Sequence, residues 1–181
     1  GPTKKLVNPE LLPRALFWFR WGAAYTWVTG VLLLGMVYYM GDQALAAGFG
    51  WSAGAGIMIA VTFLAPFIYD VLWKSGLANN LRAAVITSFV LLSIIVALFA
   101  NFAHFSYRGT LIHTATLFGT IMAFNVWFII WPNQKKALGI VTVEAEEKAA
   151  AARLAMLTSR FNTMLSIPML YMMVAQQNAG L

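Results

Sequence analysis

Residues 81–104 read LRAAVITSFVLLSIIVALFANFAH, and Arg82 is the only Lys, Arg, Asp or Glu among them. About 20 apolar residues of helix cross the roughly 30 Å hydrocarbon core of a bilayer. Inside lipid each backbone N–H and C=O must find a partner within the protein, so an apolar stretch of this length predicts a helix. Further apolar stretches of the same kind lie at about 15–40, 49–73 and 110–131, with a shorter one at 162–176.

The composition of the whole chain agrees with this reading. Of its 181 residues 61% are hydrophobic and 10% are charged, whereas soluble domains carry roughly 25% charged residues. The chain has no Cys, which excludes disulfides, thiolate zinc sites, iron–sulfur clusters and covalent c-type haem attachment. We therefore expect an all-α integral membrane helical bundle, a single domain over residues 1–181 with about five transmembrane helices.

One segment predicts an additional helix outside the membrane. Residues 143–159 are rich in Ala, Glu, Lys and Arg, which are strong helix formers, and we expect them to form a cytoplasmic amphipathic helix. Pro132 predicts the end of the transmembrane helix before it. Thr158 and Ser159 predict an N-cap that separates this helix from the last transmembrane helix.

Basic residues predict the orientation of the helices. Ten Lys and Arg lie in the N-terminal segment, the segment between the second and third stretches, and the segment before the fifth, whereas the alternate segments carry Arg108 alone. By the positive-inside rule the N-terminus of this multi-pass protein is cytoplasmic, and the C-terminus faces the periplasm or the cell exterior. The net charge of +6 is then explained by the basic residues that orient the helices in the membrane, and no nucleic-acid partner is expected.

Polar side chains inside membrane helices are costly, so each one is a candidate functional residue. His113 is the candidate metal ligand, because imidazole is a common axial ligand of b-type haem, and Thr116 lies on the same helical stripe, where it can orient the ring. His104 lies nearby across a short loop. The alternative is that His113 bonds to a backbone carbonyl or a hydroxyl within a packing interface.

Two more candidates are expected to support a bound cofactor, namely Arg20 and Asn125. Arg20 follows a cluster of aromatic residues and is read either as an anchor at the membrane interface or as a clamp on an anionic lipid or a cofactor carboxylate. Asp70 and Lys74 are four residues apart, which predicts an ion pair on one helix face. Phosphate-binding loops and the common hydrolase motifs are absent from the sequence.

Three segments together carry a family resemblance. They are LFWFRWGAAYTW at 16–27, the region from Ile112-His113 to WPNQKK at 131–136, and SRFNT at 159–163 followed by Ile167-Pro168. In order and spacing they resemble the membrane domain of the bacterial membrane-bound urate oxidase family, from about Leu12 to Ala175. The resemblance implies a membrane redox domain, part of a larger chain or complex, that binds haem b and passes electrons to a periplasmic cytochrome c or a quinone.

The same resemblance also supports a second reading. The family has His where this chain has Phe17 and Phe161, so that His113 is the only matching histidine that remains. This departure favours a non-catalytic integral subunit or scaffold that associates with other membrane subunits. A transporter is disfavoured, since no internal repeat is visible and few charges fall at mid-membrane.

Overall fold

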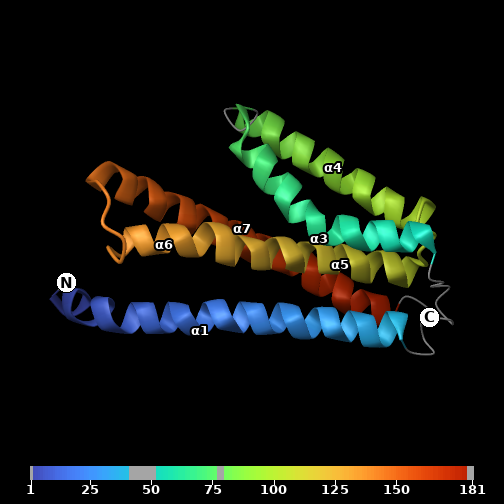
Figure 1. Ribbon diagram of the computed structural model, residues 1–181, viewed down its shortest axis with the longest axis horizontal. Coiled ribbons are helices and arrows are strands. Elements are labelled where there is room, and N and C mark those ends of the chain that lie inside the picture. The colour runs from blue at the N-terminus through green and yellow to red at the C-terminus, as the bar shows by residue number, and fades with distance from the viewer. Residues whose placement is uncertain (1, 41–51, 77–79, 179–181) are drawn as a thin grey trace. The chain divides into compact units, whose positions relative to one another are not determined.

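The computed structural model describes residues 2–40, 52–76 and 80–178, which form helices joined by short turns (Figure 1). No strand occurs in these ranges, so the all-α prediction is confirmed for the described part of the chain. In chain order the elements are α1 (Pro2–Leu34), the π-helix η1 (Gly35–Tyr39), α3 (Ala53–Lys74), α4 (Leu81–Asn101), α5 (Tyr107–Phe124), the π-helix η3 (Asn125–Ile130), α6 (Trp131–Ala137) and α7 (Ala145–Asn178).

Several of these helices are long and apolar enough to cross a membrane. Within the described residues four segments meet that description: Leu11–Tyr39, Ala53–Lys74, Arg82–Asn101 and Tyr107–Ala137. Their surfaces suit a lipid environment, since large side chains such as Ile86 and Phe89 on α4 are exposed, at 62% and 66%. Apolar exposure on this scale marks a surface that another apolar phase covers.

The last predicted transmembrane helix and the predicted cytoplasmic helix form one continuous helix, α7. The expected break at Thr158 and Ser159 is wrong: the Thr158 hydroxyl donates to the Leu154 carbonyl at 2.9 Å, inside the helix. A Ser or Thr can bond in this way to its own helix, so these residue types do not by themselves end a helix. The segment 162–176 is not among the four apolar spans, and its membrane crossing stays a prediction.

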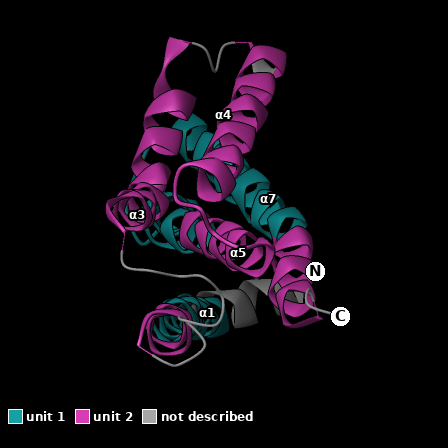
Figure 2. Cartoon of the chain, turned by 90° about the vertical axis from the view of Figure 1, so that its right-hand side faces the viewer, with its two compact units in different colours: residues 1–29, 122–165 teal, residues 30–121, 166–181 magenta. Residues whose placement is uncertain are grey.

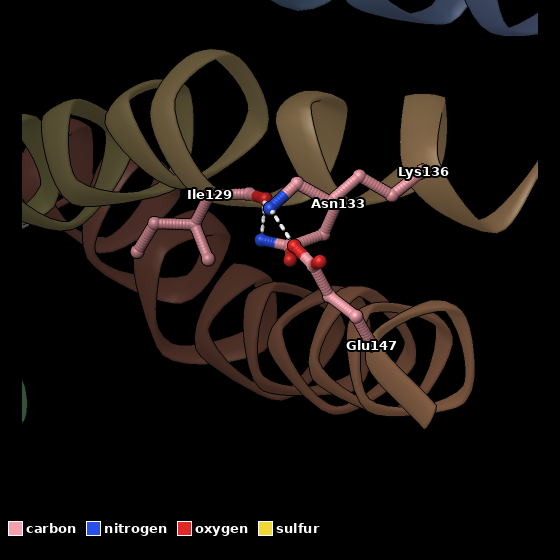
Figure 3. Close-up of polar contacts among 4 residues, drawn as sticks. All are labelled: Ile129, Asn133, Lys136 and Glu147. Carbon is pink, nitrogen blue, oxygen red and sulfur yellow. Dashed lines mark hydrogen bonds and ion pairs between the residues drawn. The ribbon is translucent and has the colours of Figure 1, made fainter. Parts of the chain in front are cut away.

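The expected helix end at Pro132 is also wrong. Pro132 occupies the first turn of α6, a position that needs no backbone N–H donor, and the helical path continues from α5 through η3 to Ala137. The wider π-turn directly before it accommodates the proline ring, and Asn133 Nδ2 donates to the Ile129 carbonyl at 2.7 Å (Figure 3). The apolar span therefore includes the WPNQKK segment.

The described chain divides into two compact units (Figure 2). Unit 1 comprises residues 1–29 and 122–165, and unit 2 comprises residues 30–121 and 166–181. In unit 1 an ion pair between Lys136 Nζ and Glu147 Oε1, at 2.7 Å, links α6 to α7 (Figure 3). The predicted Asp70–Lys74 pair, in unit 2, is confirmed at 2.6 Å.

The core of unit 2 joins the end of α1, η1, α3, α4 and the turn that precedes α5. Its buried members are Leu34, Tyr38, Ala55, Met58, Phe99, Ala103 and Phe105. The helices α3 and α4 lie side by side (Figure 1), and a Cβ atom added to Gly54 would lie 2.7 Å from the Phe102 carbonyl oxygen. Glycine is thus required where α3 meets the end of α4, as is common where membrane helices approach closely.

Candidate functional site

His113 is buried in unit 2, with 1% of its surface exposed. Its Nδ1 lies 2.7 Å from the Gly109 carbonyl oxygen, one helical turn earlier. Because a carbonyl only accepts, Nδ1 carries the proton in the neutral ring, and Nε2 accepts from the Tyr39 hydroxyl at 2.5 Å. Both ring nitrogens therefore have partners, one from α5 itself and one from η1.

Aromatic rings enclose this imidazole. Phe105 stacks on it with a centroid separation of 4.2 Å, and Phe99 lies at 5.8 Å. The Tyr39 ring meets it edge-on, also at 5.8 Å. We call Tyr39, Phe99, Phe105, Gly109 and His113 the His113 cluster. In it the hydrogen-bonded side chains of Tyr39 and His113 pack against the rings of Phe99 and Phe105.

A second set of hydrogen bonds in unit 2 ties both η1 and α5 to α7. The Tyr38 hydroxyl bonds to Gln176 Oε1, and Arg108 Nε donates to the Gln176 carbonyl at 2.8 Å. The adjacent hydroxyls of Tyr38 and Tyr39 thus reach different helices from the same π-turn. Sequence reasoning missed both tyrosines; the signal available was a pair of hydroxyl-bearing rings at the end of an apolar stretch.

Two other predicted site residues, Thr116 and His104, also belong to unit 2. Thr116 donates to its own helix, at the Ile112 carbonyl at 2.8 Å, and the orientation of His113 is held by Gly109 instead. His104 is exposed in the turn between α4 and α5, with a φ of 55°. This left-handed conformation is uncommon for a residue with a side chain, although His adopts it more often than most.

The observed arrangement does not fit haem b. A haem ligand needs a free ring nitrogen facing a cavity, whereas both nitrogens of His113 are hydrogen-bonded and its ring is packed between aromatic side chains. A metal ion held by side chains alone is a separate case, and no group of three or more His, Cys, Asp or Glu that could hold one occurs among the described residues. Ligation of haem by His113 stays a prediction that requires Tyr39 to release Nε2.

Asn125, the first residue of η3, lies in unit 1 and is fully buried. Its Nδ2 donates to Asn162 Oδ1 of α7 at 2.8 Å, and Asn162 Nδ2 donates to the Met122 carbonyl at 3.0 Å. Asn125 Oδ1 has no partner in the described structure. This amide pair joins two helices of unit 1. A π-turn disturbs the regular hydrogen bonds of the helix, and Asn162 supplies a donor to the Met122 carbonyl just before it.

Arg20, on α1, is the remaining predicted site residue, and it also lies in unit 1. Its guanidinium carbon is 3.9 Å from the Trp131 ring centroid and 5.0 Å from that of Trp127. Phe17, one turn earlier on α1, lies at 5.7 Å. The two tryptophans are four residues apart, a spacing that sequence reasoning could have used to place both on one face of the helix.

Comparison of the sequence with known proteins and protein families shows which family the chain belongs to. No curated protein and no solved structure matches the chain. The profile of one protein family, described as urate oxidase N-terminal, matches residues 2–179, nearly the whole length. The chain therefore belongs to the urate oxidase N-terminal family, as the motifs in its sequence predicted.

Proposed function

We propose that this chain is the membrane-embedded domain of a urate oxidase-like redox system. The observation that carries the proposal is the family match over residues 2–179, together with four helices of transmembrane length and composition. In this role the domain holds the system in the bacterial inner membrane. Electrons taken from the substrate leave through a periplasmic cytochrome c or a quinone.

The orientation within this proposal places the N-terminus in the cytoplasm and the C-terminus in the periplasm. It is supported by the distribution of Lys and Arg, which follows the positive-inside rule. Reporter fusions at each terminus test it: alkaline phosphatase should be active only at the C-terminus, and a cytoplasmic reporter only at the N-terminus. The reverse pattern would overturn the orientation without affecting the family.

A second candidate function is a non-catalytic subunit of the same kind of system. It is favoured by the partners of His113, since a histidine with both nitrogens engaged acts as a structural link between helices. The exposed Phe17 and Phe161 favour it as well, because neither can ligate a metal or carry a proton. In this case the electron carriers belong to other subunits.

One experiment separates the two candidates. The full chain is purified gently from its native membrane, and a reduced-minus-oxidised spectrum and a pyridine haem assay are recorded for the wild type, His113→Ala and Tyr39→Phe. Stoichiometric haem b that disappears in His113→Ala supports the redox domain with His113 as ligand, and Tyr39→Phe should then retain haem. Absence of haem from the wild type, with other membrane subunits co-purifying, supports the non-catalytic subunit.

A further inference from the structure

Arg20 lies in a cage of aromatic side chains within unit 1. We use the name Arg20 cage for Phe17, Arg20, Trp127, Trp131 and Lys135. The Trp131 ring contacts two cations, with Arg20 Cζ at 3.9 Å and Lys135 Nζ at 5.8 Å from its centroid. The rings of Trp127 and Trp21 make a T-shaped contact with their centroids 5.3 Å apart, and this contact holds the Trp127 ring in position. Aromatic faces attract cations, and they also keep water away from them.

The cage leaves hydrogen-bond donors of Arg20 unused. Nε and Nη1 are buried, and neither has a hydrogen-bond acceptor in the described structure. An aromatic face compensates part of the charge but does not replace an acceptor in the plane of the guanidinium. A buried charged donor without an acceptor costs more than a neutral one, so this position is stabilised by any group that brings an oxygen to it.

The charge of the cage is also uncompensated. Two ion pairs occur among the described residues, Lys74–Asp70 and Lys136–Glu147, and neither includes Arg20 or Lys135. Both cations lie within 6 Å of the centroid of the Trp131 ring, so two positive charges are associated with one aromatic side chain. A guanidinium supplies planar donors suited to phosphate, and an ammonium adds a point charge.

Helix length places the cage near the membrane surface. The spans Leu11–Tyr39 and Tyr107–Ala137 have 29 and 31 residues, which at 1.5 Å per residue exceed a 30 Å core by about 14–17 Å. The cage residues lie toward the N-terminal end of the first span and the C-terminal end of the second. Trp and basic residues at span ends are typical of the headgroup level, where lipid phosphates lie.

We propose that the Arg20 cage binds the phosphate group of an anionic phospholipid. The lipid phosphate supplies an acceptor and a compensating charge to the guanidinium of Arg20, Lys135 adds the second positive charge, and the Trp127 and Trp131 rings hold the guanidinium in place. The site depends on membrane insertion of the chain and not on its redox role. Loss of the haem prediction would leave it unchanged.

The test measures the thermal unfolding of the full chain in neutral detergent as lipid is added. Dioleoylphosphatidylglycerol should raise the midpoint of the wild type, and dioleoylphosphatidylcholine at the same mole fraction should raise it much less. In Arg20→Gln the apparent affinity for phosphatidylglycerol should fall by about tenfold or more, the size of one charge-assisted hydrogen bond. Lys135→Gln should weaken binding by a smaller factor, because it removes a point charge alone.

Arg14→Gln is the matched control, since it removes an exposed arginine from the same helix and the same unit. It should retain the wild-type affinity. If Arg20→Gln fails to fold, Lys135→Gln and Arg20→Lys still test the proposal, because each keeps a cation next to the aromatic rings of the Arg20 cage. Equal shifts from the two lipids, equal losses in Arg14→Gln and Arg20→Gln, or a shift from inorganic phosphate as large as that from phosphatidylglycerol would overturn the assignment to a phospholipid.

Discussion

The His113 cluster of unit 2 and the Arg20 cage of unit 1 are both polar groups among aromatic rings, yet their hydrogen bonding differs. Both ring nitrogens of His113 have partners from the chain, whereas two nitrogens of Arg20 have none among the residues that the structure describes. A buried polar group with all its partners stabilises one packing arrangement, and removing it leaves those partners unpaired. A buried charged group without partners marks a place where something outside the chain can bind.

Replacing His113 by Ala should give the largest change in stability. The substitution opens a cavity between Phe99 and Phe105 and leaves the Tyr39 hydroxyl without its acceptor, so we expect a loss of about 3–4 kcal/mol in the free energy of unfolding. Unfolding followed by circular dichroism in mild detergent measures it. Tyr39→Phe isolates the hydrogen bond and should cost about 1–2 kcal/mol.

His104→Ala is the control for this comparison. The side chain is exposed, so no packing is lost, and only the lower tolerance of Ala for a φ of 55° remains; the loss should stay within about 1 kcal/mol. If His113→Ala proved as stable as His104→Ala, the His113 cluster would not be a structural link, and a role in ligand binding would become the better explanation of its burial.

Replacing Gly54 by Ala tests the packing of unit 2 without touching a polar group. The new Cβ would lie 2.7 Å from the Phe102 carbonyl oxygen, so α3 and the end of α4 must separate, and we expect a loss of about 1–3 kcal/mol. Gly56, two residues further along α3, has open space around it. Gly56→Ala should therefore stabilise the helix by roughly 0.5–1 kcal/mol, and equal effects at the two positions would contradict this packing.

Replacing Arg20 by Gln in a neutral lipid should give a smaller change than replacing His113 or Gly54 by Ala. The variant loses contacts with Trp131 and Trp127 but also removes buried donors that lack acceptors, so the two effects oppose each other. We expect the free energy of unfolding in phosphatidylcholine to change by about 1 kcal/mol or less. A loss as large as that of His113→Ala would show that the Arg20 cage is complete without a ligand.

Some features of the fold were predictable because they depend on local sequence. The apolar stretches around Leu81–Asn101 and Ala53–Lys74 match helices to within a few residues, since their length and lack of charge leave no other structure in lipid. The breaks expected at Pro132 and Thr158 did not occur. Proline and threonine can each end a helix but do not have to, and contacts with a neighbouring segment decide whether the helix ends there.

Among the candidate site residues, His113 and Asn125 were singled out as intramembrane polar groups, and both are buried. Their partners could not be foreseen. Tyr39 lies 74 residues before His113, and Asn162 lies 37 residues after Asn125. No local pattern encodes such pairs, because they form only once particular helix faces have met.

The sequence alone determined that this is an all-helical chain with apolar spans, and its motifs identified the urate oxidase N-terminal family. Helix formation and burial in lipid follow from hydropathy summed over a continuous stretch, and motifs are properties of residue order. Only the tertiary structure decided that His113 is fully paired and that Arg20 is not. A hydrogen bond forms only when donor and acceptor atoms from distant segments come within about 3 Å of each other, and the order of residues alone does not give that distance.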